Sequence, residues 1–423
     1  MISVDISNIW CSVSLPELLS TEKTIFDAHT QLAGEHRQNS WLSWLDTSDE
    51  ARRMWINPVI DAADKIRMHS EILVVVGGGL SAAAAQAAIR LMPRVSPLRL
   101  LFIGEDYSSD KWLRVVQTLE NSEFSVLVAA PTGNETAPLI TLRALRWIME
   151  KRYGDRTKDR MFVSAGNPRS ALMKLAESLG YTILPMPESA GAGCSALSPA
   201  ALLIMAAAGM GPGLMFSGAA EMAQLCDDRS FDNPAWLYAG ARTVLAQQGL
   251  RAEVLCTPCP AAEVFGAWWQ SMTAAACNKD GQGLFLSHMR LPTDFFAMGD
   301  SLLQPGQFAS ILRLPLRSQK VTVEMDWKDL DGLGGLAGQD LTFVEGKTLD
   351  AVADAMVEHE IPFVTIEENE ELTDDHIGEL LYFMEFAAGL SARARGVSPA
   401  SRRLVPTVLD TLDKNLGRNF SNV

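Results

Sequence analysis

The stretch EILVVVGGGLSAAAAQAAIRLM, residues 71–92, decides the fold class. Residues 72–76 form a continuous apolar run, as in a strand that is buried on both faces of a parallel sheet. The glycines Gly77, Gly78 and Gly79 then make a turn, and the alanine-rich segment after them has high helical propensity. A strand, a glycine turn and a helix in this order are typical of an α/β layer. The turn also presents backbone N–H groups at a helix N-terminus, where anions bind.

The rest of the chain repeats this alternation. Further strands are expected at 98–106, 124–130, 159–165, 181–187, 251–259, 319–327 and 361–368. Helices are expected at 16–34, 48–66, 109–120, 139–154, 170–180, 233–249, 261–273, 348–360 and 374–396. The most apolar segment, residues 200–210, is too short to span a bilayer, so we expect a buried helix there.

Strands and helices that alternate in this way imply parallel sheets covered by helices on both faces. We therefore predict an α/β fold with two tandem domains. The expected divisions are an N-terminal helical segment over 1–65, a first α/β domain over 66–195, a second over 196–395, and a helical C-terminal tail over 396–423.

Net charge, the N-terminal sequence and the cysteines argue against several kinds of partner, location and cofactor. The chain has 423 residues and a formal net charge of −15, which argues against nucleic acid or an anionic membrane as the main partner. No basic region precedes an apolar core at the N-terminus, so no secretory signal is expected, and six scattered cysteines fit reduced thiols in the cytoplasm. Cys256 and Cys259 form a C-x-x-C without a second ligand pair, so we expect neither a metal nor another cofactor.

Seven segments in order resemble the phosphoglucose isomerase (glucose-6-phosphate isomerase) family in its short bacterial form. They are VVVGGGLSAAAAQAAI (74–89), TGNETAP (132–138), NPAWLYAGARTVLAQQG (233–249), FGAWWQSM with NKDGQGLF (265–272 and 278–285), PTDFFAMGD (292–300), DGLGGLAGQDLTFV (331–344) and ELLYFMEFAAGLSARARGVSP (379–399). The resemblance implies two sugar-isomerase (SIS) domains, each a parallel sheet flanked by helices. It also implies a homodimer, with residues 379–390 and the C-terminal tail among the surfaces that meet the partner.

The family interconverts glucose 6-phosphate and fructose 6-phosphate, and the resemblance assigns its catalytic positions. The glutamate that moves the proton corresponds to Ala275, the histidine that opens the ring to Phe296, and the arginine that steadies the enediolate to Gly193. The lysine near the C-terminus corresponds to Lys414. Proton abstraction next to a carbonyl needs a positioned base. Since Ala275 cannot serve as one, the sequence predicts a family member without the family's catalytic groups.

The family's phosphate loop corresponds here to residues 130–135, APTGNE, in which one hydroxyl remains, at Thr132. Glu135 would place a negative charge where the phosphate dianion binds, which is unfavourable. In the first glycine turn Leu80 replaces a glycine of the family. The residues expected to contact any ligand are Gly77, Gly78, Gly79, Ser81, Thr132 and Gly133.

Three other residues are candidates for a relocated acid or base: His288, Glu263 and Asp280. For each of them a structural role is the favoured interpretation. Trp268 and Trp269 could stack on a sugar ring, but packing of their helix is favoured.

Three hypotheses of function remain open. The first is a catalytically silent homologue that binds a sugar or sugar-phosphate ligand or serves in assembly. The second is an enzyme with a changed substrate on the same fold. The third is an active glucose-6-phosphate isomerase.

Overall fold

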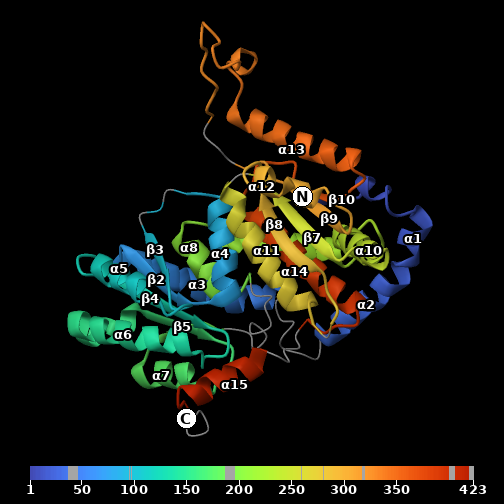
Figure 1. Cartoon of the computed structure of the whole chain (residues 1–423). Helices are drawn as coiled ribbons and strands as arrows, with labels where there is room; N and C mark the ends of the chain where they lie inside the picture. The colour runs from blue at the N-terminus through green and yellow to red at the C-terminus, as the bar shows by residue number, and fades with distance from the viewer. Residues whose placement is uncertain are drawn as a thin grey trace.

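The computed structural model describes residues 1–36, 46–94, 96, 98–185, 196–258, 260–279, 281–316, 320–399 and 405–418. Two five-stranded sheets organise this part of the chain, and helices flank both (Figure 1). The predicted α/β class with two sheets in tandem is confirmed. None of the helices in the described residues combines the length and the apolar character needed to cross a bilayer.

The first sheet is parallel throughout and has the strand order β3-β2-β4-β5-β6. Its strands are β2 (Ile72–Gly77), β3 (Arg99–Ile103), β4 (Phe124–Ala130), β5 (Met161–Ala165) and β6 (Thr182–Ile183). Its crossover helices are α4 (Gly79–Leu91), α5 (Ser109–Leu119), α6 (Thr136–Tyr153) and α7 (Ala171–Leu179). Alternate residues of β2 enter two cores: Leu73 and Val75 pack in one, and Val74 and Val76 in the other. The apolar run of β2 is continuous because helices cover both of its faces.

The second sheet has the order β1-β10-β9-β7-β8, and only the edge strand β1 is antiparallel to its neighbour. Its strands are β1 (Ser3–Asp5), β7 (Ala252–Thr257), β8 (Phe285–Arg290), β9 (Gln307–Arg313) and β10 (Phe363–Glu367).

The remaining α-helices are α1 (Leu15–Ser20), α2 (Glu22–His36), α3 (Asp49–His69), α8 (Pro199–Ala207), α9 (Pro212–Cys226), α10 (Pro234–Gln247), α11 (Glu263–Cys277), α12 (Phe295–Leu302), α13 (Leu341–Glu358), α14 (Asp374–Ala394) and α15 (Val405–Asn415). Short 3-10 turns lie at Ser7–Ile9, Gly154–Arg160, Pro260–Ala262 and Gly334–Leu336.

Three strands were not predicted from the sequence, namely β1, β8 and β9. β1 lies in the segment expected to be helical, and it pairs with β10 through Ser3 and Glu367. The strand predicted at 319–327 is wrong, because residues 320–327 contain only an isolated bridge between Thr322 and Asp340.

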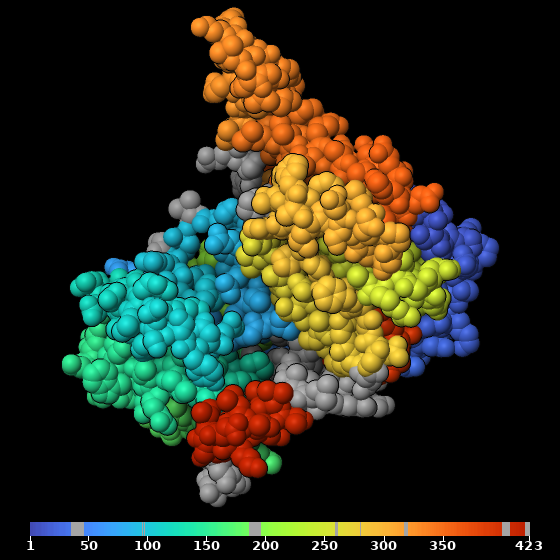
Figure 2. Space-filling model, viewed as in Figure 1, coloured from blue at the N-terminus to red at the C-terminus, as the bar shows by residue number. Residues whose placement is uncertain are grey.

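Residues 320–340, called the arm below, stand away from the rest of the molecule at the top of Figures 1 and 2. The arm folds back on itself through backbone bonds such as Val323 N–H to Gln339 O at 2.9 Å. The apolar pattern of the arm therefore finds no neighbouring sheet edge with which to form a strand. Its side chains stay exposed, with Trp327 at 91% and Leu330 at 83%.

Helix α14 is buried inside its own chain, which corrects the expectation that residues 379–390 face a partner subunit. It packs most extensively against α9. At the crossing a Cβ on Gly378 would lie 1.8 Å from Met215 O, and one on Gly218 would lie 2.0 Å from Asp375 O. The two backbones therefore approach so closely that only glycine fits, and no surface of α14 remains for a second subunit over residues 379–390.

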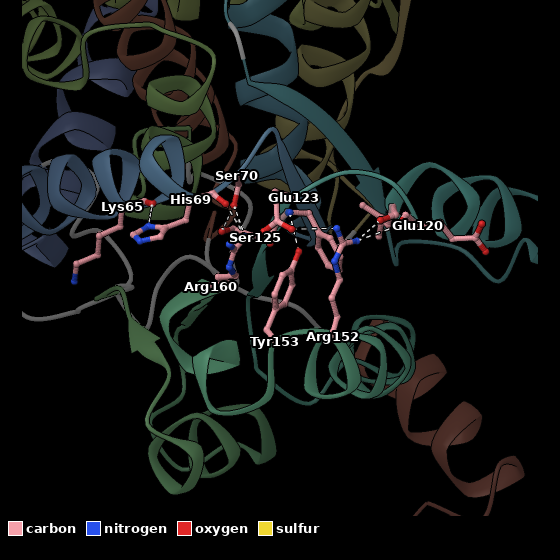
Figure 3. A network of polar contacts seen from close by, with 11 residues as sticks. Lys65, His69, Ser70, Glu120, Glu123, Ser125, Arg152, Tyr153 and Arg160 are labelled. Carbon is pink, nitrogen blue, oxygen red and sulfur yellow. Dashed lines mark hydrogen bonds and ion pairs between the residues drawn. The ribbon is translucent and has the colours of Figure 1, made fainter.

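A polar cluster joins the elements at the amino edge of the first sheet (Figure 3). Arg160 donates to His69 O at 2.6 Å and to Phe124 O at 3.3 Å, and pairs with Glu123 at 2.6 Å. Arg152 also pairs with Glu123, at 3.1 Å. These bonds tie α3, β4 and the end of α6 together, on the edge of the sheet opposite to the one where ligands bind in open α/β folds.

Candidate functional site

A cavity of about 720 Å³ lies at the carboxyl edge of the first sheet, where β2 and β4 end. Its walls come from the glycine turn, the loop after β4 and helix α15. The lining residues are Gly77, Gly78, Gly79, Leu80, Ala83, Gly104, Glu105, Tyr107, Ala129, Pro131, Thr132, Asn134, Glu135, Thr136, Ala137, Pro138, Leu409, Asp410, Leu412 and Asp413. A larger cavity of about 830 Å³ lies at the carboxyl edge of the second sheet, beside the root of the arm, but it contains none of the predicted ligand residues.

The glycine turn forms one wall of the cavity. Gly78 has a φ of 98°, and a Cβ there would lie 2.7 Å from the Cβ of Ala82. A Cβ on Gly77 would lie 2.8 Å from Ala129 O, so the turn requires glycine to let α4 start beside β4. Leu80 projects into the lining. Ser81 is buried outside it, where its hydroxyl accepts a hydrogen bond from Ser198 Oγ at 3.2 Å.

The loop after β4 is occupied by its own glutamate. Thr132 N–H donates to Glu135 Oε1 at 2.7 Å, and Asn134 N–H donates to Glu135 Oε2 at 3.1 Å. Asn134 N–H also lies 3.3 Å from Thr132 Oγ1. Gly133 does not line the cavity; it is buried against Ser170. Two of the loop's amides are thus already bound to an anion.

Helix α15 closes the cavity from the C-terminal side, and its residues Leu409, Asp410, Leu412 and Asp413 face inward. Thr136 Oγ1 donates to Asp413 Oδ1 at 3.1 Å, which fastens this helix to the start of α6. Lys414 is exposed and does not line the cavity.

The cavity wall is acidic. Among its described residues four carry carboxylates, Glu105, Glu135, Asp410 and Asp413, and none is basic. Glu105 is exposed at the cavity mouth, yet partial desolvation raises the pKa of its carboxyl, while the backbone amide of Gly79 and the charge of Lys111 oppose that shift. An acidic wall disfavours a second anion.

The residues that the resemblance assigns to the family's catalytic groups lie elsewhere. Ala275 is half-buried in α11, and Phe296 projects from α12 with 86% of its surface exposed. Neither lines the cavity, and Gly193 lies outside the described residues. Cys277, near Ala275, is buried, and its thiol donates to Ala388 O at 3.2 Å.

Two of the three candidates for a relocated acid or base, His288 and Glu263, have structural partners. His288 Nδ1 lies 2.9 Å from Gln270 Oε1, and desolvation lowers the pKa of this histidine. Glu263 pairs with Arg290 at 3.4 Å, and Asp280 lies outside the described residues.

The aromatic pair packs in the core, and one cysteine of the C-x-x-C is buried. Trp268 and Trp269 are each 1% exposed and pack in the core. Burial raises the pKa of Cys256 to about 12, whereas Cys259 lies outside the described residues.

Sequence reasoning missed Glu105, Asp410 and Asp413. Glu105 could have been found, because it follows β3 and Gly104 at the edge of the sheet where the glycine turn lies. No sequence signal places α15 against the first sheet.

The comparisons with known proteins identify the family. No family model matches the chain. A glucose-6-phosphate isomerase of Exiguobacterium sibiricum is 31% identical over 377 residues, which cover 85% of this chain and 83% of that protein. The chain belongs to the glucose-6-phosphate isomerase family. Within this family, an isomerase of Clostridium perfringens is 29% identical over 413 residues, or 94% of this chain and 91% of its own.

Solved structures agree on the fold. A hypothetical protein from Thermus thermophilus superposes with a TM-score of 0.87 at 18% identity, covering 98% of this chain and 100% of its own. A glucose-6-phosphate isomerase from Chlamydia trachomatis superposes with a TM-score of 0.80 at 13% identity, covering 98% and 88%. The expected glucose-6-phosphate isomerase fold of two SIS domains is confirmed.

Proposed function

We propose that this member of the glucose-6-phosphate isomerase family is catalytically silent and binds a small sugar-like ligand. The observation that carries the proposal is Ala275, at the position of the family's base. A methyl group cannot take a proton from carbon, and general base catalysis contributes about 10²–10⁴-fold to such a step. Phe296, at the position of the ring-opening histidine, has no group that exchanges protons.

The cavity of the first sheet supports a retained binding role. Its volume of about 720 Å³ is within the usual range for small-molecule sites. The wall combines apolar side chains, such as Leu80 and Leu412, with a few polar groups, as such sites do.

Two measurements test this function. In an assay coupled to glucose-6-phosphate dehydrogenase, the purified protein should convert fructose 6-phosphate no faster than buffer. In a thermal-shift screen of sugars and sugar phosphates, at least one neutral sugar or sugar derivative should raise the Tm. A ligand at 100 times its Kd stabilises a protein by about 2.7 kcal/mol. Robust isomerase activity would overturn catalytic silence, and a screen without any shift would overturn ligand binding.

A second candidate, an enzyme with a changed substrate, is favoured by Glu105. A carboxyl with a raised pKa in a cavity is a common form of acid–base catalyst. If this candidate holds, a ligand found in the screen should be chemically altered by the wild type and left unaltered by Glu105→Gln.

We also propose that the protein is a homodimer in the cytoplasm. The exposed apolar side chains of the arm support association, since they cannot be buried within one subunit. Four cysteines of the described residues are free thiols, which suits a reducing compartment.

A further inference from the structure

The Glu135 carboxylate binds the loop after β4 in the way that a bound oxyanion would. Each of its oxygens accepts one backbone N–H, from Thr132 at 2.7 Å and from Asn134 at 3.1 Å. The loop lies between the carboxyl end of a parallel strand and the N-terminus of the 18-residue helix α6. That place in an α/β fold is where backbone amides usually hold phosphate or another anion.

Glu135 does not use its carboxylate for the helix that it precedes. It is the N-cap residue of α6, yet its side chain makes no capping hydrogen bond to the first turn. The side chain instead turns back over residues 132–134. Its contacts are therefore with the loop and not with the helix, and its removal would leave the helix hydrogen bonds unchanged.

The opposite side of the loop is held by the C-terminal segment. Arg418 donates to Asn134 O at 3.1 Å, hydrogen-bonds the Thr136 hydroxyl, and pairs with Asp413 at 3.1 Å. This guanidinium is a positive charge next to the loop, and it is already shared with Asp413. Two of the loop's amides and this adjacent cation are thus engaged within the chain.

We propose that Glu135 is an internal ligand of the loop, which fills the place of a phosphate group and restricts the cavity to ligands without one. The restriction on ligands rests on the proposed function, because it assumes that the cavity binds a sugar-like molecule. The occupation of the amides does not rest on it. A neutral polyhydroxyl compound fits the remaining space, since its hydroxyls can donate to the carboxylates of Glu105 and Asp410.

Three single variants separate occupation of the amides from simple repulsion. Glu135→Ala removes both the charge and the oxygens that accept the amides. Glu135→Gln removes the charge but keeps one oxygen as an acceptor. Asp410→Asn removes one charge from the same cavity wall and leaves the loop as it is.

The probe is inorganic phosphate, titrated by calorimetry and by ³¹P NMR. Glu135→Ala should bind it with a Kd at least about tenfold lower than that of the wild type, because two amides become available to a charged acceptor. Glu135→Gln should gain less. Asp410→Asn should gain least, since it removes one charge from the wall but frees no amide. Tight binding by the wild type would overturn the proposal, and so would equal gains in Glu135→Ala and Asp410→Asn, which would assign the effect to charge alone.

The variant is expected to fold, since the Thr132 amide is exposed and the Asn134 amide is partly so, and water can replace the carboxylate. Melting curves check this. If folded Glu135→Ala gains no phosphate affinity, Glu135 does not hold the place of a phosphate. The phosphate titration tests the loop alone and does not depend on whether the cavity binds a sugar. A gain of phosphate binding without any sugar binding by the wild type would therefore reject the proposed function while supporting the role of Glu135.

Discussion

The guanidinium of Arg160 stacks over the ring of Tyr153, 4.2 Å from its centre, at the edge of the first sheet that faces away from the cavity. Arg160 is 7% exposed and also holds two main-chain carbonyls. We expect Arg160→Ala to destabilise the fold by about 2–4 kcal/mol, since it leaves buried acceptors without a donor. Urea unfolding measures the loss.

Arg152→Ala is the matched control, because Arg152 is more exposed and shares the partner Glu123. It should cost about 1 kcal/mol or less. A larger loss for Arg152→Ala than for Arg160→Ala would show that the exposed pair, and not the buried contacts, secures this edge.

Restoring the base alone should not restore catalysis. Ala275→Glu supplies a carboxylate on α11. On the assignment that the resemblance gives, Phe296 still replaces the ring-opening histidine, and under the proposal above Glu135 still fills the place of the phosphate. Residues that act as a unit are not additive, so we expect no turnover above background in the coupled assay. Turnover by this single variant would show that the rest of the site is intact.

Glu105 should make stability depend on pH near and above its unfolded pKa. Its folded pKa is raised, so the folded state keeps the proton to higher pH than the unfolded state does. Stability is thus lost as the pH rises from about 4.3 through the folded pKa. The Tm of Glu105→Gln minus that of the wild type should increase as the pH rises above about 4.3. A difference that stays constant would contradict this.

His29 should have the opposite effect on the pH dependence of stability, because its contribution is lost as the pH falls. Its Nδ1 accepts the Trp236 indole N–H at 2.8 Å, and desolvation, the main cause, lowers the pKa of the buried imidazole. The wild type should therefore lose stability as the pH falls below about 6.5 towards the folded pKa. His29→Asn should show a shallower fall of the Tm over that interval, whatever its stability at pH 8. An unchanged slope would assign acid sensitivity to other groups.

We expect the arm to form the contact between the two subunits of the homodimer. Trp327→Ala combined with Leu330→Ala removes its two most exposed apolar side chains. Light scattering should then report a 46.1 kDa monomer in place of a dimer. Trp147→Ala, which removes another exposed tryptophan, this one from α6, should remain dimeric. A monomeric wild type would reject the homodimer.

The first sheet was predictable because each of its elements is encoded locally. The apolar run and glycine turn at 72–79 specify a buried strand and a tight start of α4 without reference to distant residues. β1 could not be predicted in this way, since three residues gain strand geometry only from β10. The prediction of a strand at 319–327 failed for the converse reason. The sequence pattern of the arm suits a strand, but no sheet edge in the described part of the chain lies beside it.

The candidate site was predictable only in part, for a similar reason. The glycine turn at 77–79 and Thr132 could be located by their resemblance to the family's loops. The sequence also indicated that the charge of Glu135 is unfavourable for a bound phosphate. The Glu135 carboxylate accepts the loop's own amides because its side chain turns back over the loop. The spacing of residues in the sequence does not reveal that direction. The wall formed by Asp410 and Asp413 depends on the docking of α15, a long-range contact.

β1 also constrains the order in which the protein can be made. Ser3 and Glu367 pair although 364 residues separate them. At about 5–20 residues per second, β10 leaves the ribosome roughly 20–70 seconds after β1, and the strand has no partner in that interval. The first sheet, within residues 72–183, can form meanwhile. The second sheet is therefore completed only near the end of synthesis, and residues 196–395 expressed alone would leave β10 as an unprotected edge prone to aggregation.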